Sequence, residues 1–354
     1  MITRDLIVIG ASAGGVEALT RLVRGLPEDL PAAVCVVLHM PPNNPSVLHR
    51  ILQRAGPLPA KNPRDGEPIE RGCVYVAPPD HHLLVKNGFL RLTNGPRENG
   101  FRPAVDPLFR SAALSYGARV IGVVLSGNLD DGTIGLATIE SRGGMTVAQD
   151  PRDAPHPGMP TNAIENVPVH HILPAADMGP LLAQLVQEPI PDTGVQIMSD
   201  EETVMENEAS ELDATAMHGD SHPGVPSGFG CPDCGGVLFL IDQHSLEHFR
   251  CRVGHAWSPD SLLARQTDTL EHALWTALRA LEESSVLSFR VGQRLRAKGN
   301  ASGADRFEER SRETRNQAGL IRQILAEPGL FPESASGEMD VAESAPAQRE
   351  RAAS

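Results

Sequence analysis

Three residue types that form hydrolytic triads lie at points where predicted strands end. Ser12 lies in the segment 10–14, Gly-Ala-Ser-Ala-Gly, which fits G-x-S-x-G and follows an apolar run at 6–9. A strand–turn–helix of this kind lifts a serine hydroxyl clear of the sheet, and the glycines let a substrate approach. His39 and Asp131 follow two further apolar runs. Together the three types would supply a nucleophile, a base and an orienting acid.

The turn at Ser12 has a second interpretation. Backbone N–H groups at the start of the following helix could hold a phosphate or a nucleotide. The segment does not match G-x-G-x-x-G, because Ser12 stands where the second glycine would be. The second strand ends in His39 rather than in an acidic residue that would hold a ribose. The nucleotide hypothesis is therefore the weaker one, although a structural turn remains open.

A second group of reactive side chains lies late in the chain. Cys231, Cys234, Cys251 and His255 follow the pattern C-x₂-C, sixteen residues, C-x₃-H. Two ligands from one turn and two from a facing turn can enclose a tetrahedral Zn²⁺, which predicts a structural zinc ribbon. A closed Cys₃His site has no open position for water, so we expect no cofactor for catalysis. The alternatives are a metal-free hairpin with free thiols and a catalytic zinc.

The elements that would position the N-terminal residues alternate between strand and helix. Apolar runs at 32–38, 74–79, 120–126 and 145–149 predict buried strands, and Asn87-Gly88 predicts a hairpin turn. The fold class is therefore α/β, a doubly wound and mainly parallel sheet with a β-hairpin. Functional groups collect at the carboxyl ends of strands in such sheets, which is where Ser12, His39 and Asp131 lie.

Composition divides the 354 residues into unequal parts. The net charge is −14, and residues 188–227 hold ten acidic residues without Lys or Arg. This segment predicts an acidic, disordered linker, and the overall charge argues against nucleic acid as a partner. No run of 18 apolar residues occurs and three of the five cysteines belong to the metal pattern. We therefore expect a cytoplasmic protein without direct membrane insertion.

The C-terminal part begins with Ser258-Pro259, a helix N-cap followed by proline. Apolar residues at helical spacing predict a helical hairpin over 258–327, with a break at 299–303 and a second helix at 304–325. It would pack on itself, form a homodimer, or dock onto a helical receptor. The predicted domains are a catalytic α/β domain (1–187), the linker (188–227), a zinc ribbon (228–257), the helical hairpin (258–327) and a disordered tail (328–354).

Several motifs together resemble a known family. They lie in the family's order at 9–15, 38–41, 76–83, 102–106, 125–132, 148–150 and 158–160. The set resembles the catalytic domain of the bacterial chemotaxis protein-glutamate methylesterases of CheB type. This resemblance implies hydrolysis of glutamate γ-methyl esters on chemoreceptor helices, with release of methanol, and some members also deamidate glutamine. The family's usual receiver domain does not precede residue 1, so we expect no control by aspartyl phosphorylation within this chain.

The resemblance implies roles for five residues. Ser12 would be the nucleophile, His39 the general base and Asp131 the orienting acid, while the backbone N–H groups of Ala13 and Asn128 would form the oxyanion hole. The family's usual loop reads G-M-G-x-D-G, whereas here 128–130 read Asn-Leu-Asp, so a leucine replaces a glycine and Asp130 is a second candidate for the acid. Ala13 also replaces a common threonine.

The sequence thus leads to two functional hypotheses of different class. The first is an esterase that demethylates glutamyl esters on a methylated chemoreceptor or receptor-like helical protein, with a possible glutamine deamidase activity. The second is a catalytically weak regulatory or scaffold module that binds signalling partners through the zinc–helix region. The altered loop at 128–130 keeps the second hypothesis open.

Overall fold

A seven-stranded sheet forms the centre of the N-terminal half of the protein. The computed structural model describes residues 2–42, 46–190, 204, 207, 210, 224–327 and 330–331. The strands are β1 (Leu6–Ala11), β2 (Ala33–Leu38), β3 (Ala60–Lys61), β5 (Val74–Val76), β8 (Val120–Val124), β9 (Met145–Gln149) and β10 (His171–Leu173). Their order is β10-β9-β8-β1-β2-β5-β3, and every neighbouring pair is parallel. The predicted doubly wound sheet is confirmed.

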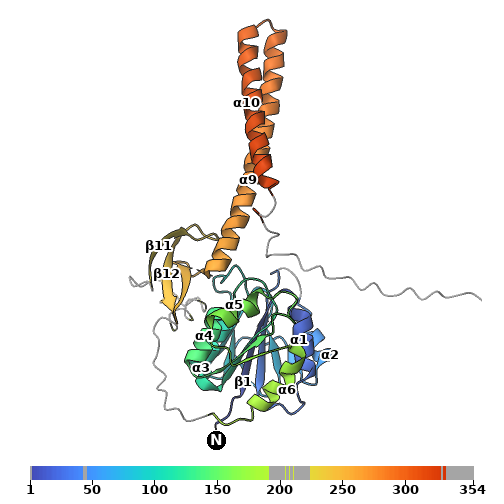
Figure 1. The fold of residues 1–354 in the computed structure, drawn as a ribbon, viewed down its shortest axis with the longest axis vertical. Helices are drawn as coiled ribbons and strands as arrows, with labels where there is room; N and C mark the ends of the chain where they lie inside the picture. The colour runs from blue at the N-terminus through green and yellow to red at the C-terminus, as the bar shows by residue number, and fades with distance from the viewer. Residues whose placement is uncertain are drawn as a thin grey trace, which may run out of the picture.

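Helices cover both faces of this sheet (Figure 1). One face packs against α1 (Gly15–Arg24), α2 (Leu48–Ala55) and α6 (Ala175–Leu185), and the other against α3 (Val105–Tyr116), α4 (Thr133–Ser141) and α5 (Gly158–Asn166). In β1, Ile7 and Ile9 join the first core while Leu6 and Val8 join the second. Burial on both faces explains why the central strands are continuous apolar runs rather than alternating ones.

The strand order places a topological switch point beside β1. The chain leaves β1 for β2 on one side and returns later as β8 on the other side. The loops that follow β1 and β8 therefore begin next to each other at the carboxyl edge of the sheet. Open α/β sheets bind their ligands in the crevice at such a point. Ser12 is the residue that follows β1.

A small antiparallel sheet carries the predicted hairpin. It consists of β4 (Glu67–Pro68), β6 (His82–Lys86) and β7 (Phe89–Thr93), in the order β4-β7-β6. Asn87 and Gly88 form the hairpin turn with φ of 51° and 84°, the conformation that favours this pair in two-residue turns. The backbone N–H of Val85 donates to Ser111 Oγ on α3 at 3.0 Å, which ties β6 to the main domain.

The C-terminal part contains a second antiparallel sheet, which we call the ribbon (residues 224–257). Its strands are β11 (Val225–Gly230), β12 (Val237–Gln243), β13 (Leu246–Cys251) and β14 (Ala256–Trp257), in sequence order. A small core of Leu238, Phe249, Trp257 and Leu262 lies beneath them. The sheet starts before residue 228, the predicted boundary, because β11 pairs with β12 through Val225 and Leu240.

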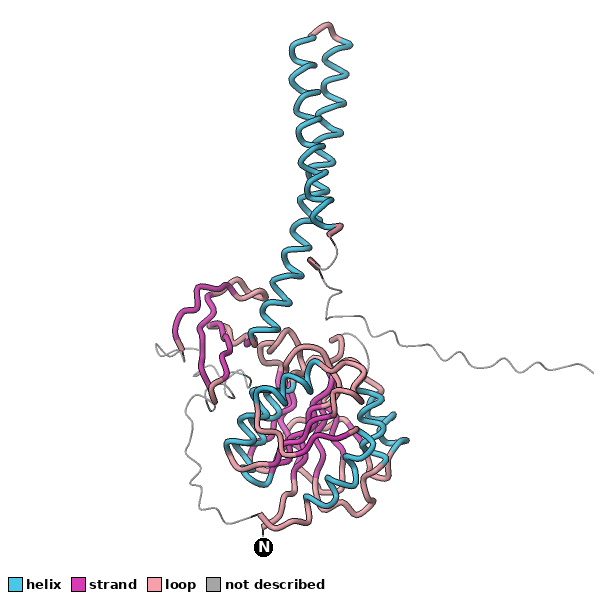
Figure 2. The backbone as a smooth tube through the Cα atoms, in the orientation of Figure 1, coloured by secondary structure: helices cyan, strands magenta, loops and turns pink. Residues whose placement is uncertain are grey.

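Two long antiparallel helices follow the ribbon, as predicted, and extend away from the α/β domain (Figure 2). They are α9 (Pro259–Ala297) and α10 (Ala301–Leu325). The predicted cap is present, since Ser258 Oγ accepts a hydrogen bond from Ser261 N–H at 3.2 Å. The second helix begins at Ala301 rather than at 304, because Asn300 Oδ1 caps Gly303 N–H at 2.9 Å. Within the described chain, none of the helices is both long and apolar enough to cross a membrane.

Most of the predicted acidic linker, and most of the predicted tail, lies outside the described residues. Ser210 departs from the expectation of a solvated spacer, because its side chain is fully buried. Its Oγ donates to Glu98 Oε1 at 2.7 Å, and its carbonyl accepts from Thr93 Oγ1 at 2.7 Å. At this position the segment therefore packs against the α/β domain, and its acidic composition gave no sign of that contact.

Candidate active site and metal site

Ser12 lies in a tight turn between β1 and α1. Its backbone N–H donates to Ser126 O at 2.9 Å, and its carbonyl accepts from Gly15 N–H at 2.8 Å. Gly14 adopts φ 71° as the N-cap of α1, a left-handed conformation that suits glycine. The loop after β8 lies directly against the serine, since a Cβ placed on Gly127 would lie 2.8 Å from Ser12 Cβ. The two loops of the switch point therefore meet at Ser12.

The three predicted triad residues lie together. His39 Nδ1 is 3.2 Å from Ser12 Oγ, and His39 Nε2 is 2.6 Å from Asp131 Oδ2. His39 and Asp131 are buried, while Ser12 is half-buried. An ionised Asp131 accepts from Nε2–H, so the neutral imidazole has its Nδ1 lone pair directed at the serine hydroxyl. This arrangement is suited to taking a proton from Ser12.

Phe101 holds the imidazole from one face, a contact that the sequence did not predict. The rings of His39 and Phe101 stack with centroids 3.8 Å apart and an interplanar angle of 8°. Phe101 immediately precedes the motif at 102–106, which the family resemblance had marked without a role. The stacking restricts rotation of the imidazole about the line between its two partners, and it excludes water from that face.

Asp131 accepts hydrogen bonds from four donors, and the one from the His39 ring is the shortest. Its Oδ2 accepts from His39 Nε2 and from Val105 N–H at 2.7 Å, and its Oδ1 accepts from Asn99 Nδ2 at 3.0 Å and from Asp106 N–H at 3.3 Å. Burial alone would raise the pKa of Asp131, but the hydrogen bonds and the charge of His39 together hold that pKa below its usual range. The carboxyl is therefore ionised at neutral pH.

The neighbouring Asp106 behaves in the opposite way. Burial, followed by the negative charge of Asp131, raises the pKa of Asp106 well above its usual value. Its Oδ1 accepts from Gly135 N–H at 2.7 Å and its Oδ2 from Asn99 Nδ2 at 3.2 Å. Two buried carboxyl groups in contact share one charge between them, and the charge resides on Asp131, which faces the imidazole.

Asp130, the second candidate for the acid, does not contact His39. Its Oδ1 accepts from Ser258 Oγ at 2.6 Å and from Ser261 Oγ at 3.1 Å, at the start of α9. Burial raises the pKa of Asp130 to about 6 against the lowering effect of these two hydrogen bonds. The geometry thus favours Asp131 as the partner of the imidazole, whereas Asp130 contacts the start of the C-terminal helices.

The two predicted oxyanion donors directly follow Ser12 and Gly127, the two residues at which the loops meet. Within the described residues, the backbone N–H groups of Ala13 and Asn128 have no hydrogen-bond partner, which leaves them available to a ligand. Leu129 adopts φ 61°, so the leucine that replaces the family's glycine still takes the left-handed conformation. Asn162 Nδ2 donates to the carbonyl of Leu129 at 3.0 Å and helps to hold the loop in that conformation.

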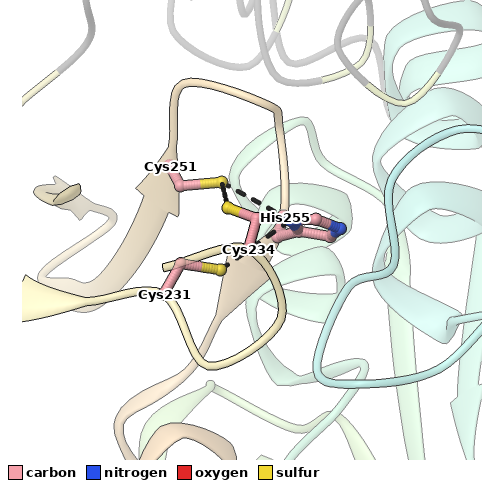
Figure 3. A group of neighbouring side chains, drawn as sticks. All are labelled: Cys231, Cys234, Cys251 and His255. Atoms are coloured by element: carbon pink, nitrogen blue, oxygen red, sulfur yellow. Dashed lines mark hydrogen bonds between the residues drawn. The ribbon is translucent and has the colours of Figure 1, made fainter. Parts of the chain in front are cut away.

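The four predicted metal ligands converge in the ribbon (Figure 3). All of their ligand atoms lie within 4.8 Å of one another. Cys234 Sγ is 3.6 Å from Cys251 Sγ, and His255 Nδ1 is 3.6 Å from Cys251 Sγ and 3.7 Å from Cys231 Sγ. Zinc–sulfur bonds of about 2.3 Å in a tetrahedron would separate two sulfurs by about 3.8 Å, so the cluster has the size of a metal site. These residues could hold a structural metal ion.

The remaining cysteines take no part in this cluster. Cys35 in β2 and Cys73 are buried free thiols. Burial raises the pKa of the Cys35 thiol far above its usual value. Burial also raises the pKa of the Cys73 thiol, so both thiols are protonated at neutral pH and are poor nucleophiles.

The family model and the curated relatives that match this chain agree on one family. The family model of the CheB methylesterase matches residues 7–182. A protein-glutamate methylesterase/protein-glutamine glutaminase of Anaeromyxobacter dehalogenans is 39% identical over 183 residues, covering 52% of this chain and 54% of that protein. A relative from Leptospira interrogans, whose name gives the same two activities provisionally, is 36% identical, and the match covers 52% of this chain and 95% of that protein.

A solved structure agrees with these relatives. The crystal structure of the Thermotoga maritima CheB methylesterase catalytic domain superposes with a TM-score of 0.50 at 36% identity, covering 52% of this chain and 100% of that one. The chain spans about half the length of the first curated relatives it matches. The family model ends at residue 182, so the ribbon and the helices lie beyond the residues that it matches.

Proposed function

The chain belongs to the CheB methylesterase family, and we propose that it hydrolyses glutamate γ-methyl esters on a methylated chemoreceptor or similar helical protein. The observation that carries the proposal is the line of contacts from Ser12 Oγ through His39 to Asp131, at 3.2 and 2.6 Å. The names of the relatives add a protein-glutamine glutaminase activity, which uses the same acyl chemistry on a glutamine side chain.

In the proposed acylation step, Ser12 Oγ attacks the γ-carbonyl carbon of the ester. His39 Nδ1 takes the hydroxyl proton, and the charge of the resulting imidazolium is stabilised by Asp131 across the 2.6 Å contact. The backbone N–H groups of Ala13 and Asn128 donate to the developing oxyanion. The tetrahedral intermediate collapses as His39 returns the proton to the leaving methoxide, and methanol departs.

Hydrolysis of the acyl-enzyme repeats these steps with water. A water molecule gives its proton to His39 Nδ1 and attacks the acyl carbon. The bond between that carbon and Ser12 Oγ then breaks, and His39 returns the proton to Oγ. The product is a glutamate side chain. The removal of one oxyanion donor lowers the rate by about 10²–10³-fold in other serine enzymes. We therefore expect each of the two backbone N–H groups to contribute to the rate of hydrolysis.

For the ribbon we propose a structural Zn²⁺ held by Cys231, Cys234, Cys251 and His255. The soft thiolate donors, the size of the cluster and the turns that carry it support zinc over a hard cation such as Mg²⁺. Four protein ligands leave no open coordination position, so the metal supplies folding energy to the ribbon and takes no part in ester hydrolysis.

The proposed activity is tested on a methylated receptor signalling domain. After incubation with the full chain, mass spectrometry of receptor peptides should show glutamate where glutamyl methyl esters stood, and Ser12→Ala should leave the esters intact. Esters that survive incubation with the wild-type chain, across receptors from several sources, would refute the proposal.

A second function is favoured by the exposed apolar side chains of the helical hairpin. Leu263, Leu270, Trp275 and Leu287 on α9 and Leu320 on α10 are all more than half exposed. We propose that this hairpin binds a partner, either a receptor or a second copy of the chain. Ser12→Ala separates the two functions, since it should abolish hydrolysis and leave partner binding and the oligomeric state unchanged.

A further inference from the structure

A buried contact between the two halves of the protein runs through Asn99. Its side chain is buried and lies between the acid of the proposed triad and Ser258, the N-cap residue of α9. Asn99 Nδ2 donates to Asp131 Oδ1 at 3.0 Å, and Asn99 Oδ1 accepts from the backbone N–H of Ser258 at 2.8 Å. One amide group therefore joins the N-terminal site to the junction between the ribbon and α9.

The contact with Ser258 fixes which way the amide points. A backbone N–H only donates, so it must face the oxygen of the Asn99 amide. The nitrogen is then directed at the carboxyl groups of Asp131 and Asp106, which accept at 3.0 and 3.2 Å. Without the Ser258 N–H, the amide loses the partner that holds its oxygen away from Asp131. A flipped amide would place two oxygens against each other and weaken the hold on the carboxylate.

The ribbon also holds the backbone that carries Asn99. The N–H of Asn99 donates to Ala256 O at 2.8 Å, and the N–H of Ala256 donates to Arg97 O at 3.3 Å. The segment at 97–99 therefore extends the edge of β14. Trp257, next along the chain, is buried, and a Cβ placed on Gly100 would lie 3.7 Å from its ring.

A buried ion network strengthens the same junction. Glu98 accepts from Arg110 Nη2 on α3 at 2.8 Å and from Arg250 Nη2 on β13 at 3.3 Å. All three side chains are almost fully buried. The carboxylate of Glu98 thus pairs with a cation of each half beside Asn99, and removing one partner of a buried ion pair is costly.

We propose that Asn99 is a positioning residue for Asp131 and that the backbone N–H of Ser258 sets its orientation, so that the ribbon–helix module completes the acid side of the N-terminal site. The proposal rests on the proposed function of Ser12, His39 and Asp131. Asn99 touches none of the reacting atoms and acts through the carboxylate. The ribbon and α9 then contribute to the geometry of the proposed active site.

The test uses full-length variants that change these contacts with little backbone strain. Asn99 has φ 53°, a conformation that glycine and aspartate tolerate, so Asn99→Gly removes the amide and Asn99→Asp keeps the acceptor without the donor. Ser258 has φ −72° and ψ 163°, which proline adopts, so Ser258→Pro replaces the N–H and Ser258→Ala retains it. Ser261→Ala alters the neighbouring contact with Asp130 and serves as the control.

Two rates are measured: labelling of Ser12 by a fluorophosphonate, and methanol release from a methylated receptor domain. We expect Asn99→Gly and Asn99→Asp to lower both the labelling rate and kcat by about 10–10²-fold with an unchanged KM, because misplaced catalytic groups cost rates of this size. The labelling rate and kcat of Ser258→Pro should be about tenfold or more below those of Ser258→Ala. Ser261→Ala should be labelled at the wild-type rate. Bound metal and the thermal transition are recorded for each variant.

Wild-type labelling rates in both Asn99 variants, or equal rates in the proline and alanine variants of Ser258, would overturn the proposal. A labelling rate that falls as far in Ser261→Ala as in Asn99→Gly would also overturn the proposal, because equal losses would indicate a general loosening of the junction. If Asn99→Gly does not fold, the two Ser258 variants decide. Methanol release by the wild type judges the proposed function separately, since the labelling ratios need no ester substrate.

Discussion

The carboxylate of Asp131 lies 2.6 Å from Nε2 of His39, the ring nitrogen that faces away from Ser12. Nδ1 is thus the nitrogen that would take the serine proton. Asp131 is buried and accepts hydrogen bonds from His39, Val105 and Asn99. It therefore favours the tautomer of His39 that carries its hydrogen on Nε2, which is the function of the acid in serine triads.

Replacement of Asp131 by asparagine should lower kcat by about 10³–10⁴-fold, as the equivalent change does in another serine enzyme. An amide nitrogen facing Nε2 would favour the tautomer with hydrogen on Nδ1, which cannot take the serine proton. The measurement is kcat for ester hydrolysis by the full chain. Asp130→Asn is the matched control and should lose far less, because Asp130 contacts Ser258 and Ser261 rather than His39. Equal losses in both variants would contradict the assignment of the acid.

Metal removal should unfold the ribbon and leave the α/β sheet intact. A shared ion would join the ligands of two separate segments, Cys231 and Cys234 on one and Cys251 and His255 on the other, so its binding energy is folding energy for this small sheet. Elemental analysis should give one zinc per chain, and a chelator or Cys251→Ser should remove it and lower the thermal transition of the C-terminal part. Cys73→Ala, which changes a thiol outside the cluster, should keep the metal. A zinc content that Cys251→Ser does not reduce would exclude this site.

Glu98→Gln should destabilise the protein by about 3 kcal/mol, because it leaves the buried cations Arg110 and Arg250 without their shared carboxylate. The exposed pair of Glu282 and Arg322 provides the control, and Glu282→Gln should cost less than about 1 kcal/mol. Urea unfolding of the metal-loaded chain gives both values. Similar free energies of unfolding for the two variants would show that the junction contributes little to stability.

The pH dependence of stability should carry a contribution from Asp130. Burial, opposed by the hydrogen bonds of Ser258 and Ser261 and reinforced by the charges of Asp260 and Asp131, raises the pKa of this carboxyl from 3.8 to about 6 in the folded protein. The folded state thus holds the proton more tightly, so the contribution is present at low pH and is lost as the pH rises toward 6.

Comparison with Asp130→Asn isolates this contribution, because the variant retains every other titrating group. From about pH 4.5 to 7, the free energy of unfolding of the wild type should fall by about 2 kcal/mol relative to the variant. A difference that rises with pH over this range would mean that the carboxyl is better stabilised in its charged form, contrary to its buried surroundings.

The sequence predicted the sheet because its strands are apolar on both faces and end in marked turns. It also predicted Ser12, His39 and Asp131 as neighbours, since the carboxyl ends of parallel strands share one edge. The metal ligands followed from spacing alone. The choice between Asp131 and Asp130 depended on family resemblance until the contacts to His39 and Ser258 were seen.

Other features had no sequence signal. Phe101 and Asn99 lie in an irregular segment, where no period relates a side chain to the site. The burial of Ser210 and the docking of the ribbon on Glu98 are contacts between segments more than 100 residues apart, and the acidic composition around Ser210 indicated solvent exposure instead. The orientation of the His39 ring likewise depends on tertiary contacts rather than on local pattern.

Methanol release from a methylated receptor signalling domain is the most direct test of the central claim, with wild type, Ser12→Ala and His39→Ala compared as metal-loaded full-length proteins. We predict steady release by the wild type and a fall of about 10⁴–10⁶-fold in each variant, with partner binding retained. Release that persists in Ser12→Ala, or its absence in the wild type while the receptor is bound tightly, would contradict the account and favour a scaffold that binds through its helical hairpin.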